Sequence, residues 1–180
     1  MTKRISLLFA FLATGLLWPG CKAVDKLTHF DMDYDESMVI SSLIGVNLPF
    51  NLWTPAITTN SESTFEVNET RKDLVEKIVL KKLELTLTSP ANGDFSFLKS
   101  AIIYLSADGL PEVEIAKITD IPSDIGNFIS FETYSTDLKE YIKKDNISLR
   151  MNTTTDELIL SDQQVSVHAV FFVDAKILGI

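Results

Sequence analysis

The sequence predicts a mainly β protein, an antiparallel β-sandwich of the immunoglobulin-like or jelly-roll-like kind with two short helices. Three observations predict it. Apolar and polar residues alternate with a period of two over much of the chain, turn residues separate these runs, and no regular alternation of strands and helices occurs. With 180 residues, 46% of them hydrophobic, the chain can form one domain around one core.

Half-buried strands are expected wherever apolar residues take every second position, over 30–35, 82–88, 112–115, 129–132 and 147–152. Two further runs, 101–105 and 165–173, are apolar on both faces. They are expected to be central strands that are covered on both sides. Turn residues predict breaks at 89–93, 108–111 and 121–126, and at the polar stretch 153–157.

Two short helices are expected between these strands. The first spans 71–79, with Thr70 as a candidate cap. Its apolar residues form one helical stripe: Leu74, Val75, Ile78 and Val79. The second spans 137–144, with Leu138, Tyr141 and Ile142 facing inward. Its lysines stand at the C-terminal end, where the helix dipole favours positive charge.

The first twenty residues have the features of an export signal. A positively charged start (1–4) precedes fourteen uncharged residues (5–18), and Pro19, Gly20 and Cys21 follow directly. Fourteen residues are too few for a typical membrane-spanning helix, which needs about 20, but they suit the central region of a signal peptide.

This segment resembles a bacterial lipoprotein signal, in which a small residue directly precedes a cysteine that becomes acylated. The resemblance implies removal of residues 1–20, lipidation of Cys21 with palmitate-type chains, a short lipidated tether over 21–27, and a single sandwich domain over 28–180. Trp18 departs from the pattern, since Leu is usual three residues before the cysteine. An ordinary signal cut after Ala23 and a retained N-terminal anchor are the alternatives.

The same resemblance implies a location. Lys22, rather than an acidic residue, follows the cysteine, which favours the outer membrane as the part of the cell envelope to which the protein is anchored. In its overall pattern, the chain resembles uncharacterised envelope lipoproteins of Bacteroidota-type bacteria, whose function is unknown.

Charge makes nucleic acid a poor candidate for a partner. The chain has 16 basic and 25 acidic side chains and a formal net charge of −9. Lys3 and Arg4 precede Cys21 and no acidic residue does, so the segment from Cys21 onward carries 14 basic and 25 acidic side chains, or −11. Such a surface repels phosphate backbones. Cys21 is the single cysteine, so no internal disulfide is possible.

An acidic stretch, Asp31 to Glu36, superficially resembles a calcium loop. An EF-hand loop needs Gly at its sixth position and Glu at its twelfth, where this chain has Glu36 and Ser42. The alternation instead predicts that the three aspartates lie on the solvated face of one strand, with a cation site of another kind as the alternative.

Residues 48–55 are unusually apolar for a segment that contains two prolines. If exposed, Phe50 and Trp53 form a possible binding surface that could stack on a sugar or a peptide or enter lipid headgroups. The alternative is a loop that folds over one end of the sandwich.

No catalytic, metal or cofactor site is expected. His29 and His168 are isolated and are interpreted as ordinary strand histidines, since zinc needs three or four ligands, and no catalytic or nucleotide motif occurs. We therefore expect a non-enzymatic binding or scaffolding module on the membrane, whose protein or glycan partner the sequence does not identify. A carrier of an apolar ligand within the sandwich and an envelope hydrolase with an acidic site are the alternatives.

Overall fold

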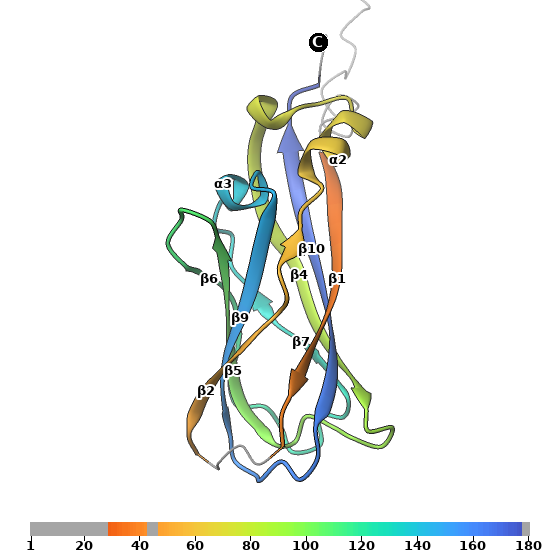
Figure 1. The fold of residues 1–180 in the computed structure, drawn as a ribbon, viewed down its shortest axis with the longest axis vertical. Helices are drawn as coiled ribbons and strands as arrows, with labels where there is room; N and C mark the ends of the chain where they lie inside the picture. The colour runs from red at the N-terminus through yellow and green to blue at the C-terminus, as the bar shows by residue number, and fades with distance from the viewer. Residues whose placement is uncertain (1–28, 43–46, 178–180) are drawn as a thin grey trace, which may run out of the picture.

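A computed structural model describes residues 29–42 and 47–177, which form two antiparallel sheets packed face to face (Figure 1). The residues of the predicted signal and tether lie outside the described part. Sheet A has the strand order β1 (His29–Ile40), β10 (Gln163–Ala175), β4 (Val75–Ser89) and β7 (Phe128–Ser130).

Sheet B has the order β2 (Pro49–Trp53), β9 (Asn146–Thr155), β5 (Leu98–Ala107), β6 (Val113–Ile118) and β8 (Glu132–Thr133), and β3 (Ile57–Thr58) also pairs with β9. The helical segments are α2 (Ser61–Val67), a 3₁₀ turn (Lys72–Leu74) and α3 (Lys139–Ile142).

The strand pairing is that of a jelly roll. β1 pairs with β10, β2 with β9, β4 with β7 and β5 with β6, all antiparallel. Early strands therefore pair with late ones and middle strands with each other, as in a double Greek key. The predicted fold class is confirmed, and of its two variants the jelly roll is the one observed.

The core lies between the sheets and follows the predicted alternation. In β4 the leucines at 83, 85 and 87 are buried, and in β9 the inward residues at 147, 149 and 151 are buried. The largest fully buried side chains come from both sheets and from the segments that close the sandwich, among them Phe65 of α2, Phe95, and Phe171 of β10.

The helix predicted over 71–79 was wrong. Residues 72–74 form a single 3₁₀ turn, and β4 begins at Val75. The register of β4 against β10 shifts at three places, where Glu76, Lys81 and Thr88 are extra residues on β4. Such bulges place buried residues three apart instead of two, and the result imitates the apolar stripe of a helix.

Other boundaries also differ from the expectation. α3 lies within the predicted 137–144 and is shorter; Asp137 Oδ1 accepts hydrogen bonds from the backbone N–H groups of Lys139 and Ile78, both at 3.1 Å. Helix α2 was not predicted. The polar residues 153–155 continue β9 rather than forming a turn.

The two strands predicted to be covered on both faces are central in their sheets but covered on one face only. In β5, Ile103 and Leu105 are buried, whereas Ile102 and Tyr104 are only partly buried. In β10, alternate residues such as His168 are likewise partly exposed. The outer faces of both sheets are therefore available to solvent.

Both ends of the described chain lie at one end of the sandwich. His29 pairs with Asp174 at the start of β1 and the end of β10, next to α2 (Figure 1). Any segment that precedes β1 therefore joins the domain at the α2 end, and the outer faces of the sheets lie along its sides.

Candidate functional site

Three outward side chains on neighbouring strands of sheet B form one row. Trp53 of β2 is the register partner of Arg150 of β9, which in turn is the partner of Tyr104 of β5. The residues on either side of Arg150, Leu149 and Met151, are buried. Since side chains alternate along a strand, this row faces away from the core.

The guanidinium of Arg150 is held on several sides. Its Nε and Nη2 donate to the two carboxylate oxygens of Glu112 at 2.9 and 2.6 Å, and its Nη1 donates to Asn51 Oδ1 at 2.6 Å. Its carbon atom lies 4.1 Å from the centre of the Tyr104 ring and 5.6 Å from that of Trp53. These are bidentate and cation–π contacts, which fix an arginine in one orientation.

The Arg150–Glu112 pair is also favourable electrostatically. Hydrogen bonding to Arg150 lowers the pKa of Glu112, and hydrogen bonding to Glu112 raises the pKa of Arg150. Both groups stay charged near neutral pH and compensate each other. The Arg150 side chain is only 16% exposed. It therefore packs between the Trp53 and Tyr104 rings with its charge paired to Glu112, and it is not a free cation.

Trp53 remains half exposed, at 52% of its surface. Asn51 and Asn152 are register partners on the same face, and Asn152 Nδ2 donates to Asn51 Oδ1 at 2.9 Å. We refer to Trp53, Arg150, Tyr104, Asn51, Asn152 and Glu112 together as the platform: an aromatic surface with two amides and a neutralised ion pair beside it.

The two residues proposed from the sequence lie on opposite faces of β2. Trp53 points outward, while Phe50 is partly buried and packs against the core. The segment that contains them is an edge strand and not a loop over one end of the sandwich. Pro49 is compatible with this position, because a residue that lacks an N–H can begin an edge strand.

The outward side of sheet B carries a second aromatic contact, between β6 and Tyr134, the residue that follows β8. The Tyr134 hydroxyl donates to Glu114 at 2.7 Å, and Lys117 Nζ lies 5.7 Å from the centre of the Tyr134 ring. The hydrogen bond to Glu114 raises the pKa of Tyr134. Glu114 is the register partner of Tyr104, so this contact continues the face on which the platform lies.

The acidic stretch lies on the outer face of sheet A, as the alternation predicted: Asp31, Asp33 and Asp35 are exposed on β1. Asp31 forms an ion pair with Lys81, and His168 Nδ1 lies 2.8 Å from Asp35 Oδ1 and its Nε2 4.0 Å from Asp33 Oδ1. Residues 29–42 and 47–177 contain no group of three or more His, Cys, Asp and Glu side chains that could hold a metal ion.

Both histidines have carboxylate partners that sequence reasoning missed. His29 Nε2 lies 3.3 Å from Asp174 Oδ1, and its ring lies 5.0 Å from that of Phe172. His168 lines an open depression of about 470 Å³ with Asp31, Asp33 and two lysines. The pairs depend on the register of β1 against β10, which a single sequence does not specify.

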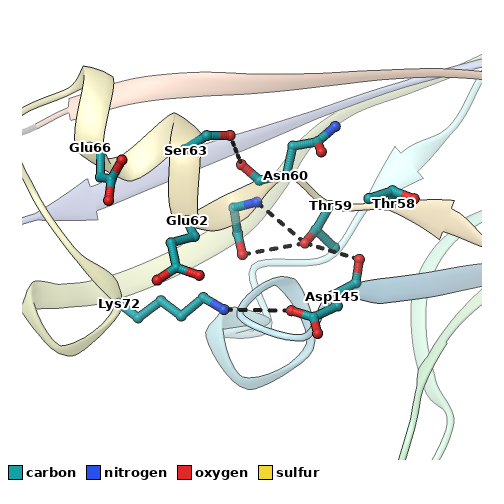
Figure 2. Close-up of a pocket in the computed structure, with 9 residues that line it drawn as sticks. Thr58, Thr59, Asn60, Glu62, Ser63, Glu66, Lys72 and Asp145 are labelled. Atoms are coloured by element: carbon teal, nitrogen blue, oxygen red, sulfur yellow. Dashed lines mark hydrogen bonds and ion pairs between the residues drawn. The ribbon is translucent and has the colours of Figure 1, made fainter.

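A second open depression, of about 390 Å³, lies between the start of α2 and the start of β9 (Figure 2). Two contacts join its walls. The Thr59 hydroxyl donates to Lys144 O at 2.6 Å, and Lys72 Nζ lies 3.8 Å from Asp145 Oδ1. Glu62 and Glu66 also line it, and neither forms an ion pair within the described residues (Figure 2). The two contacts tie the residue before the α2 cap Asn60 and the 3₁₀ turn to the segment that leads into β9, so Thr59 and Lys72 serve the fold.

In the described ranges, no helix has the length and apolar character needed to cross a membrane.

Comparisons with known proteins give a fold similarity and no family. No family model matches the chain, and no curated protein matches it. Among solved structures, the chain is similar to one from Desmodium yellow mottle tymovirus, with 13% identity and a TM-score of 0.30 over 84% of this chain and 85% of that one. A similarity this distant carries no functional argument, so function must be argued from the residues of the site.

Proposed function

We propose that the chain is a non-enzymatic binding module of the cell envelope, anchored by lipid at Cys21 to the outer membrane, and that it binds its ligand on the platform. The observation that carries the binding surface is the half-exposed Trp53 beside an arginine that is fixed by Glu112, Asn51 and two aromatic rings. Exposed, rigidly held aromatic residues bind ligands at a low entropic cost.

The geometry supports binding better than catalysis. A hydrolase that relied on His168 would need this side chain to activate a hydroxyl or a water molecule, but its two ring nitrogens face Asp35 and Asp33. Both aspartates are well exposed, and the depression beside them is open. The platform is also open, whereas electrostatic catalysis is strongest in sites that exclude water.

A carrier of an apolar ligand has less support. Such a carrier needs an internal cavity of several hundred Å³ with apolar walls. The two depressions described above are lined mainly by polar residues and open at the surface. The platform, in contrast, offers an aromatic side chain directly to solvent.

The anchor and the platform are compatible. Seven residues, 22–28, lie between Cys21 and His29, so the two can be at most about 29 Å apart when this segment is extended. The tether would hold the α2 end of the sandwich toward the bilayer (Figure 1). The platform lies on the side of the domain, at the middle of β9, so a ligand could approach it along the membrane surface.

Substitution of the cysteine tests the anchor. Cys21→Ala should move the protein from the membrane fraction to the soluble fraction, because it removes the two or three acyl chains that would hold the protein on the bilayer. Trp53→Ala, which keeps Cys21, is the matched control and should remain with the membrane. A Cys21→Ala protein that stays in the membrane fraction contradicts the lipid anchor.

Substitution of the exposed tryptophan tests the binding surface. The lipidated protein and its Trp53→Ala and Phe128→Ala variants are used to capture material from envelope extracts. Phe128 is a good control because it is 45% exposed on the opposite sheet. Material that is retained by the native protein and by Phe128→Ala, and lost with Trp53→Ala, is the expected result; equal capture by all three contradicts the proposal.

A further inference from the structure

We infer that the ligand of the platform is an uncharged glycan. This inference rests on the proposed function, since it assigns a ligand class to the same surface. It follows from three properties of the platform: an exposed ring face, a hydrogen-bond donor and acceptor beside it, and the absence of a free charge of either sign on the arginine and its carboxylate partner.

The ring face suits the apolar side of a sugar. A pyranose presents C–H groups on its faces and hydroxyls around its edge, so it stacks on a tryptophan while its hydroxyls remain free for hydrogen bonds. Trp53 is half exposed, and the strand that carries it is paired with β9 over its full length. The ring is therefore presented by a paired strand and not by a loop.

The two amides supply matching polar groups. Asn51 Oδ1 accepts from both Arg150 and Asn152. Among the described residues, Asn51 Nδ2 and Asn152 Oδ1 make no hydrogen bond. One donor and one acceptor are thus left on the same face as Trp53. A sugar hydroxyl both donates and accepts, and two neighbouring hydroxyls could satisfy both amides.

Charge argues for an uncharged ligand. Arg150 is paired with Glu112 through two nitrogens, and its third side-chain contact is with Asn51, so it offers little attraction to an acidic group. The net charge of −11 from Cys21 onward repels polyanions. A cationic ligand would have to compete with Arg150 for the Tyr104 ring, because the guanidinium carbon already lies 4.1 Å from the centre of that ring.

Tryptophan fluorescence gives a direct test. The chain has two tryptophans, and Trp18 precedes Cys21, so in the processed protein all tryptophan emission comes from Trp53. The processed, lipidated protein in detergent micelles is titrated with neutral polysaccharides (dextran, mannan, laminarin and xyloglucan), with the anionic polysaccharide alginate and with polylysine. The expected result is a saturable emission change with at least one neutral polysaccharide and none with alginate or polylysine.

Two variants connect the signal to the platform. Asn152→Ala removes the free acceptor and should weaken binding of that polysaccharide about tenfold, the effect of one lost hydrogen bond. Phe128→Ala should leave the affinity unchanged. Far-ultraviolet circular dichroism identifies any variant that fails to fold, and Asn152→Gln, which keeps an amide, should retain more affinity than Asn152→Ala.

The outcomes separate the two proposals. No response to any neutral polysaccharide, or a response to polylysine or alginate alone, overturns the glycan assignment; if envelope capture still depends on Trp53, the binding surface itself stands. Capture that does not depend on Trp53 overturns the proposed function and, with it, this inference.

Discussion

Replacing Arg150 with methionine should destabilise the domain by about 2 kcal/mol. Methionine keeps the length and the apolar stem of the arginine but removes its charge. The change breaks the bidentate pair with Glu112, the hydrogen bond to Asn51 and the ring contacts with Tyr104 and Trp53. The side chain joins three strands of sheet B, so all of these losses affect the folded state.

The magnitude follows from the exposure of the two partners. Exposed ion pairs contribute about 0.2 to 1 kcal/mol, and the upper end applies here because the geometry is bidentate and Arg150 is only 16% exposed; Glu112, at 34%, is partly screened by solvent. Each ring contact adds about 0.5 kcal/mol. For a domain of this size, 2 kcal/mol corresponds to a fall of about 4 to 8 °C in melting temperature.

A double-mutant cycle isolates the ion pair. Urea unfolding is followed by circular dichroism for the native protein, Arg150→Met, Glu112→Gln and the double variant, and the coupling energy between the two sites should be about 1 kcal/mol. A coupling energy below about 0.3 kcal/mol, together with an unchanged melting temperature for Arg150→Met, would refute the claim that this arginine is fixed by its neighbours.

Three further predictions concern the core and the same ion pair. Leu85→Ala removes a fully buried side chain between the sheets and should reduce the free energy of unfolding by about 3 kcal/mol; a loss below about 1 kcal/mol in urea unfolding would be inconsistent with that burial. Tyr34→Phe removes the hydroxyl that donates to Thr59 O at 2.7 Å and whose pKa is raised by burial, and it should cost about 1 kcal/mol in the same assay, whereas an unchanged stability would exclude that bond. The pKa of Glu112 is held below its ordinary 4.5 by hydrogen bonding to Arg150, so the stabilisation by this pair is present above pH 4.5 and is lost as the pH falls through the lowered pKa; the stability difference between the native protein and Glu112→Gln should therefore shrink in acid, and a difference that grows would contradict the assignment.

The fold class could be predicted because burial alternates along most strands. The leucines of β4 and the inward residues of β9 repeat with a period of two, and this pattern alone implies strands with one buried face. The sandwich follows from the number of such strands and the lack of strand–helix alternation. The pairing order could not be predicted, because it depends on contacts between residues far apart in sequence.

The start of β4 shows where the pattern misleads. Val75 and Ile78 are three residues apart and both buried, yet they belong to one strand, because Glu76 is an extra residue in a bulge. A single sequence does not distinguish such a bulge from a helical turn. Helix α2 was missed for the opposite reason: Phe65 is its one buried large apolar side chain, so it has no stripe to detect.

The platform could be predicted only in part. The composition of 48–55 indicated Trp53 as a candidate, and its exposure agrees with that interpretation. Arg150 and Tyr104 were not recognised, because each belongs to an ordinary alternating strand, and only the register of β2, β9 and β5 brings them beside Trp53. Phe50 is partly buried whereas Trp53 is exposed, because two residues that are three positions apart in a strand point to opposite faces of the sheet.

The most direct test of the account is hydroxyl-radical footprinting of the lipidated protein in intact envelopes and after purification. Oxidation is quantified by mass spectrometry at Trp53 and, as a control, at Phe128 on the opposite sheet. The account predicts that Trp53 is protected in the envelope and reactive in the purified protein, while Phe128 reacts equally in both. Equal oxidation of Trp53 in the two preparations would contradict the claim that the platform binds a ligand.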